Sequence, residues 1–89
     1  MDKALDSIIG EIPIGCIFDS HFVINQLIRN HSDAYLDFAK SFNGSNITPA
    51  MHGHIGQKID KHSSVDQQGK SWSENIHTNA SECTCWRKK

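Results

Sequence analysis

The chain has 89 residues and a formal net charge of −1, with 37% hydrophobic and 21% charged side chains. This length allows one small domain, and so small a charge does not by itself indicate a nucleic-acid or an acidic partner. The distribution is more informative, because residues 1–47 carry three basic and six acidic groups, whereas residues 48–89 carry six basic and four acidic ones. The C-terminal half therefore has a mild positive bias.

The cellular location follows from features that the sequence lacks. The N-terminal stretch MDKALDSIIG is acidic and does not contain the apolar core of a secretory signal. No stretch approaches the ~20 apolar residues of a membrane span. Three cysteines, an odd number, fit a reducing compartment better than a disulfide scaffold. We therefore expect a cytoplasmic protein without a membrane partner.

The first elements are a helix and a brief strand. Apolar residues at helical spacing predict a helix over Asp2–Ile9, with Gly10 as its natural stop. The segment Ile12–Phe18 is short, rich in β-branched residues and interrupted by Pro13. We expect it to form a turn and then one strand near Cys16–Phe18.

Two further helices are predicted after this strand. Asp19 and Ser20 are suited to cap the first of them, which has the strongest helical spacing in the chain. Ser32 and Asp33 are suited to cap the second, which is expected to extend to Phe42. The apolar residues of the two helices are Val23, Ile24, Leu27, Ile28, Tyr35, Phe38, Ala39 and Phe42.

The segment TPAMHGHIGQKIDKH, Thr48–His62, begins as a helix should. Thr48 supplies an N-cap and Pro49 a first-turn residue after a loop over Asn43–Asn46. Its apolar residues recur at four-residue intervals and are Met51, Ile55 and Ile59. We expect one buried core made by Val23, Ile24, Leu27, Ile28, Phe38, Phe42, Met51, Ile55 and Ile59.

After residue 62 the sequence becomes rich in Ser, Asn, Thr and Gly. Val65 fits a short strand, Cys83–Trp86 fits a returning strand, and Gly69–Ala80 is predicted to be a long hairpin loop between them. Trp72 and Trp86 are each expected to anchor their segment to the core.

This order of elements resembles the winged helix-turn-helix family. FDSHFVINQLIRNHSDAY, Phe18–Tyr35, is similar to the entry from strand to helix in such domains, and TPAMHGHIGQKI, Thr48–Ile59, is similar to their final helix. The resemblance covers most of the chain and implies an α+β, mainly helical fold in a single domain. Residues 1–62 would form a core of three to four helices, and residues 63–89 a C-terminal β-hairpin, or wing. The helix over Ser32–Phe42 departs from the tight turn of the simplest members.

The glycines of the final helix allow two explanations. On a helical wheel Gly53 and Gln57 lie opposite the apolar stripe, and each glycine costs roughly 1 kcal/mol relative to alanine. One explanation is a bare backbone for close approach by another molecule. The other is close packing within the chain, under Trp72 or Trp86. Asp60 lies on the same face and would oppose a phosphate.

The resemblance implies that this helix enters the major groove of duplex DNA. The DNA-binding residues would then be Gly53, His54, Gln57, Lys61, Lys70, Arg87, Lys88 and Lys89. The predicted function is a small DNA-binding regulator. The alternative is a non-enzymatic protein-interaction module or inhibitor on the same scaffold, and a homodimer is possible in either case.

Catalytic and metal sites have weaker support. The sequence has no phosphate-binding glycine loop, and an enzyme is not expected. The Cys83-x-Cys85 pair is a weak zinc signal, and His52 and His54 diverge by about 200° on a helix. We therefore expect no metal or cofactor, and buried thiols at Cys83 and Cys85.

Overall fold

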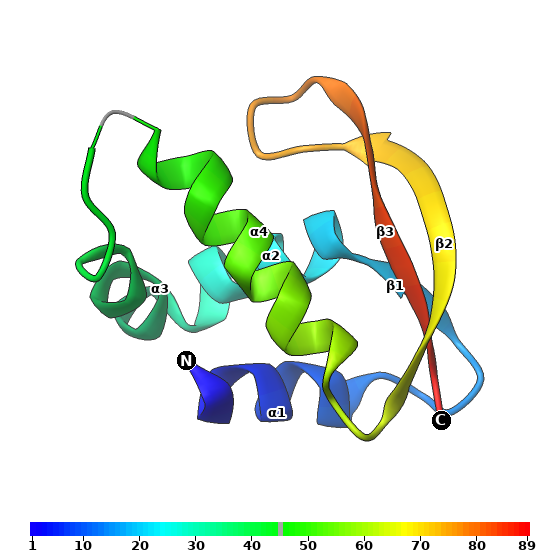
Figure 1. The fold of residues 1–89 in the computed structure, drawn as a ribbon. Coiled ribbons are helices and arrows are strands. Elements are labelled where there is room, and N and C mark those ends of the chain that lie inside the picture. Colours follow the sequence, from blue (N-terminus) through cyan, green and yellow to red (C-terminus); the bar gives the residue numbers. More distant parts are fainter. Residues whose placement is uncertain (45) are drawn as a thin grey trace.

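The computed structural model describes residues 1–44 and 46–89. It combines helices, which make up about half of the chain, with a three-stranded antiparallel sheet (Figure 1). In chain order the elements are α1 (Asp2–Glu11), β1 (Ile17–Asp19), α2 (Ser20–Asn30), α3 (Ser32–Ala39), α4 (Ile47–Asp60), β2 (Val65–Glu74) and β3 (Ala80–Lys88). The predicted α+β class and the C-terminal hairpin are confirmed.

The sheet has the strand order β1-β3-β2, so β3 is its central strand. The expected long loop over Gly69–Ala80 is wrong, because β2 extends to Glu74 and only residues 75–79 connect it to β3. The register shifts between Gln67 and Gly69, where Gly69 has a φ of 106° that suits glycine at a bulge. The second half of β2 has Trp72 as its one large apolar residue and therefore lacks the apolar alternation by which strands are recognised.

Asp19 caps α2 as predicted, because its carboxylate accepts a 2.8 Å hydrogen bond from the backbone N–H of Phe22. The sequence patterns that predicted the other helix ends were less accurate. Helix α1 runs through Gly10 to Glu11 and ends just before Pro13, which disfavours helical geometry in the residue preceding it.

The caps of α3 and α4 also differ from the prediction. His31 is the N-cap of α3 and Asn46 that of α4, and neither side chain makes a capping hydrogen bond. Ser32 therefore lies inside α3, which ends at Ala39, and Thr48 lies inside the first turn of α4. The two helices thus begin within one or two residues of the predicted positions, which is the usual uncertainty of a helix boundary.

The core lies between the helices and the sheet. Of the nine residues expected in it, Ile28, Phe38 and Phe42 are only partly buried, and α3 contributes no fully buried residue. The complete cluster of buried residues is Ala4, Leu5, Ile8, Ile9, Ile12, Phe18, Val23, Ile24, Leu27, Met51, Ile55, Ile59, Val65 and Trp86. Helix α1 and the sheet thus supply a large share that the predicted core omitted.

The two tryptophans behave differently. Trp86 is fully buried and packs against Phe18, with ring centroids 5.7 Å apart, so its predicted role as an anchor is confirmed. Trp72 is 70% exposed, and its predicted role as an anchor is wrong. Within residues 1–44 and 46–89, no helix has both the length and the apolar character needed to cross a membrane.

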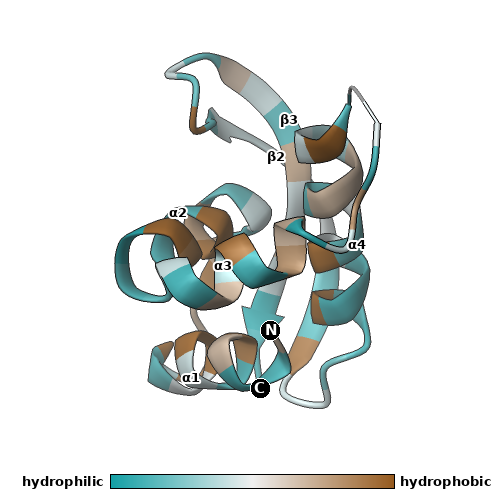
Figure 2. Ribbon diagram, turned by 90° about the vertical axis from the view of Figure 1, so that its left-hand side faces the viewer, coloured by the Kyte–Doolittle hydropathy of each residue, from teal (hydrophilic) through white to brown (hydrophobic). Residues whose placement is uncertain are grey.

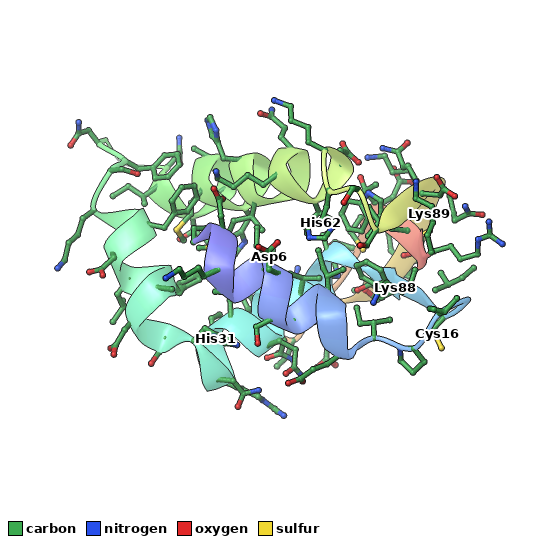
Figure 3. The ribbon with its side chains drawn as sticks, turned by 90° about the horizontal axis from the view of Figure 1, so that it is seen from below. Asp6, Cys16, His31, His62, Lys88 and Lys89 are labelled. Carbon is green, nitrogen blue, oxygen red and sulfur yellow. The ribbon has the colours of Figure 1, made fainter. Side chains whose placement is uncertain are left out.

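Lys88 connects the last strand to the first helix. Its side chain is buried, and its Nζ donates hydrogen bonds to the backbone carbonyls of Ile9 (2.7 Å) and Ile12 (3.0 Å). Figure 3 shows it beside the last turn of α1, with Lys89 farther out. A cation at the C-terminal end of a helix satisfies carbonyls that have no partner within the helix. Lys88 is therefore a structural residue.

We expect Lys88→Met to lower the free energy of unfolding by about 1–3 kcal/mol, because it keeps the aliphatic stem but removes the donor to the carbonyl of Ile12 and one of the two donors to that of Ile9. Urea unfolding measures this difference. The matched control is Lys89→Met, since the side chain of Lys89 is 47% exposed. Equal effects of the two substitutions would contradict the structural role of Lys88.

Candidate nucleic-acid interface

Helix α4 lies across the front of the molecule, and no other element covers it in that view (Figure 1). Its apolar stripe is buried: Met51 is 2% exposed, and Ile55 and Ile59 are fully buried. The helical wheel is therefore correct. Gly53, His54, Gln57 and Lys61 are exposed, as predicted.

Gly53 and Gly56 lie one turn apart on α4. A Cβ atom built at either glycine meets no atom within 4 Å among the residues that the structure describes. The explanation of these glycines by close packing under Trp72 or Trp86 is therefore wrong. Because each glycine costs roughly 1 kcal/mol relative to alanine in a helix, their presence is not explained by the fold of this chain.

The two glycines line a groove of about 360 Å³ between α4 and the hairpin. Its wall on the α4 side includes Gly53, Gly56 and Gln57, and its hairpin wall includes Lys70, Glu82 and Thr84. Figures 1 and 2 both show the hairpin loop at the end of the molecule where α4 begins. The groove thus joins the outward face of α4 to the outer half of the hairpin.

Asp60 also lines this groove, but its carboxylate is held by the sheet. Its Oδ1 accepts hydrogen bonds from Nε1 of Trp86 (2.7 Å) and Nε2 of Gln67 (2.9 Å). Asp60 is exposed and shares this face with Gly53 and Gln57, as predicted, so its carboxylate would oppose a phosphate there. Its two hydrogen bonds tie the end of α4 to β2 and β3.

His54 and Lys61 lie on the other flank of α4, away from the groove. The ring of His54 contacts that of Phe42 edge-on, with centroids 5.2 Å apart. Lys61 borders a hollow shared with Asp2 and Asp6 of α1. The structure therefore places Gly53, Gln57 and Lys70 together around the groove, whereas His54 and Lys61 lie outside it, one turn from Gln57 along the helix.

The predicted basic patch at the C-terminus is reduced to two exposed residues. Lys88 is buried, while Arg87 and Lys89 lie 3.6 and 3.4 Å from carboxylate oxygens of Asp66. These residues lie near the lower end of the sheet in Figure 1, at the opposite end from the hairpin loop. They do not extend the surface made by α4 and the groove.

Trp72 was missed as a surface residue. It pairs with Glu82 across the hairpin, and Lys70 pairs with Thr84, so these four side chains project from one face of the ribbon. Lys70, Glu82 and Thr84 all line the groove, which places the exposed indole of Trp72 beside it. The signal available in the sequence was the alternation of serine with larger side chains in KSWSE, Lys70–Glu74.

Two histidines hold the elements around the groove in place. The ring of His21 connects α2 to both strands of the hairpin, with Nδ1 2.7 Å from the hydroxyl of Ser73 and Nε2 3.4 Å from that of Ser81. Nε2 of His52 lies 2.8 Å from the hydroxyl of Tyr35 and so connects α4 to α3. Burial lowers the pKa of His52, and the nearby His77 and His21 lower it further.

This shift predicts a pH dependence of stability. Because the pKa of His52 in the folded chain lies below its ordinary value of 6.5, the unfolded chain binds more protons as the pH falls through that value. The free energy of unfolding is therefore expected to decrease from about pH 6.5 down to the folded pKa, and to be independent of this group at higher pH. Urea unfolding at a series of pH values measures the effect.

His52→Gln should remove this part of the acid sensitivity, whereas the parts due to other histidines remain. The informative quantity is thus the difference between the two pH profiles. Parallel profiles for the two proteins would show that His52 does not contribute.

The cysteines and the remaining ligand types give no metal cluster within residues 1–44 and 46–89. Cys83 and Cys85 are buried free thiols, as predicted, and Cys16 is exposed. In the part of the chain that the structure describes, no three His, Cys, Asp or Glu side chains lie where they could hold a metal ion. Comparison with family models, curated proteins and solved structures gives no match to this chain.

Proposed function

We propose that this chain is a small DNA-binding protein of the winged-helix type, in which α4 enters the major groove and the hairpin lies beside it. The observation that carries the proposal is the pair Gly53 and Gly56, which leaves the backbone of an exposed helix bare over open space. A bare helix surface permits closer approach to base edges and sugar-phosphate than a surface with side chains. The order of helices, short strand and C-terminal hairpin supports the same assignment.

The arrangement of polar groups on α4 fits a helix lying in a groove. Gln57 is exposed on the outward ridge, where a side-chain amide can pair with the edge of adenine. Lys70 lies on one flank, and His54 and Lys61 lie on the other. A major groove has a phosphate strand on each side, so cations on both flanks suit the two backbones.

The electrostatic contribution to this interface is small. Arg87, Lys88 and Lys89 are withdrawn from it, which leaves Lys61 and Lys70 as its lysines. Each phosphate contact contributes a slope of about −0.9 to the dependence of log affinity on log salt. We therefore expect a shallow salt dependence and an affinity that depends mainly on shape and on Gln57.

Gly53→Leu tests the proposal directly. The leucine side chain would occupy the approach surface, so binding to a duplex selected from a random library is expected to weaken by roughly 1–3 kcal/mol or more. Stability should stay equal or rise, because leucine is a better helix former than glycine. Fluorescence anisotropy at low salt measures the affinity, and thermal unfolding measures the stability.

Gly10→Leu is a matched control, since Gly10 is an exposed helical glycine of α1 that also faces open space. It should raise helix stability without changing DNA affinity. Gln57→Ala should reduce discrimination between the selected duplex and unrelated duplexes by about 1–3 kcal/mol. If Gly10→Leu and Gly53→Leu weaken binding equally, α4 does not form the interface.

A protein-interaction module is the second candidate. Trp72 is 70% exposed beside the groove, and Ile76, which lines a neighbouring hollow at the start of α4, is 36% exposed. Large aromatic residues are enriched at protein interfaces. Failure of any selected duplex to bind at micromolar protein would favour this candidate. The face around Gly53 and Trp72 would then be a docking surface for another protein.

A further inference from the structure

A second groove lies outside the surface used by α4. Residues of α1, β1, α2 and the turn between α1 and β1 form it, and its volume is about 500 Å³. Ile17 and Phe18 of β1 lie along it, with Ile12 on the side of α1 and Phe22 on the side of α2. The proposed contact with DNA does not use this groove.

Large apolar side chains are exposed in and around this groove. Ile17 is 62% exposed and Phe22 is 43% exposed, and both line it. Ile14, in the turn that leads to β1, is 81% exposed. A cluster of this kind on a small chain is typical of a surface that a partner covers.

The strand along this groove is also a free sheet edge. β1 pairs with β3 on one side, and its other side pairs with no strand within residues 1–44 and 46–89. An edge strand presents backbone N–H and C=O groups to which another extended chain can add. Ile17, Phe18 and Asp19 all line the groove, so such a chain would lie within it.

The charge of this groove identifies the chemistry of its occupant. Glu11 and Asp19 line it, and its described lining contains no lysine or arginine. Residues 1–47 as a whole carry three basic and six acidic groups. A second copy of this chain docked through the same groove would bring like charges together, which opposes association, whereas a basic partner is attracted.

We infer that this groove binds an extended apolar segment of a partner protein that carries Lys or Arg and adds to β1 as a further strand. Alternate side chains of the segment pack on Ile17 and Phe22, while its cations lie near Glu11. Backbone hydrogen bonds to the edge of β1 fix its direction. This inference does not depend on what α4 binds.

Selection of a phage-displayed library of random 12-residue peptides against the full chain tests the inference. The expected peptides alternate apolar residues with Lys or Arg. As free peptides they should bind in calorimetry, and they should shift the backbone amide signals of Ile17 and Phe22. Methylation of alternate backbone nitrogens in the peptide should abolish binding, because it removes the donors of the added strand.

Two pairs of variants locate the site. Ile17→Lys and Glu11→Lys should each weaken peptide binding by about tenfold or more, the scale of an interface anchor or of a paired charge. Leu36→Lys and Glu74→Lys change exposed residues outside the groove and should have no effect. Thermal unfolding should show that all four variants remain folded. If Ile17→Lys does not fold, Glu11→Lys keeps the test decisive.

Three results would overturn the inference. One is the absence of any enriched peptide. Another is enrichment of acidic peptides, or of peptides that bind the Ile17→Lys variant unchanged. The third is a dimer in sedimentation that Ile17→Lys dissociates, which would assign the groove to a second copy of this chain.

Discussion

The position of α4 depends on the indole of Trp86. This side chain is fully buried in the central strand, packs against Phe18 of the neighbouring strand, and donates its Nε1–H to the carboxylate of Asp60. One residue therefore connects β3, β1 and the end of α4. The burial of Ile55 and Ile59 fixes the rotation of the helix about its axis, and the bond to Asp60 fixes its distance from the sheet. Gly53 and Gln57 face outward as a consequence.

The apolar helices could be predicted from the sequence, because their stripes repeat over several turns. Val23, Leu27, Met51 and Ile55 are buried as expected. The outer half of β2 could not be predicted in this way, since its half-buried residues are serines and Trp72 is the one large apolar residue among its exposed ones. A short polar strand is stabilised by pairing with its neighbour, and a single sequence does not contain that information.

The candidate site could be predicted from the sequence only in part. The outward face of α4 could be predicted from helical spacing alone, and the structure confirms that Gly53, His54, Gln57 and Lys61 are exposed. The role of Lys88 could not be predicted, because a lysine in a basic run is normally expected at the surface. Only the structure shows that its Nζ donates to the carbonyls of Ile9 and Ile12. Such contacts between distant residues decide which charges a partner can reach.

The central claim is that the outward face of α4 contacts duplex DNA, and titration of the ¹⁵N-labelled chain with a selected duplex tests it most directly. The backbone amides of Gly53 and Gly56 resonate in the distinct glycine region of the spectrum, so their response can be followed without ambiguity. The account predicts that these two signals shift together with those of Gln57 and Lys70, while that of Ile17 stays in place. Shifts centred on Ile17, or no shift at Gly53 and Gly56 when the duplex is bound, would contradict it.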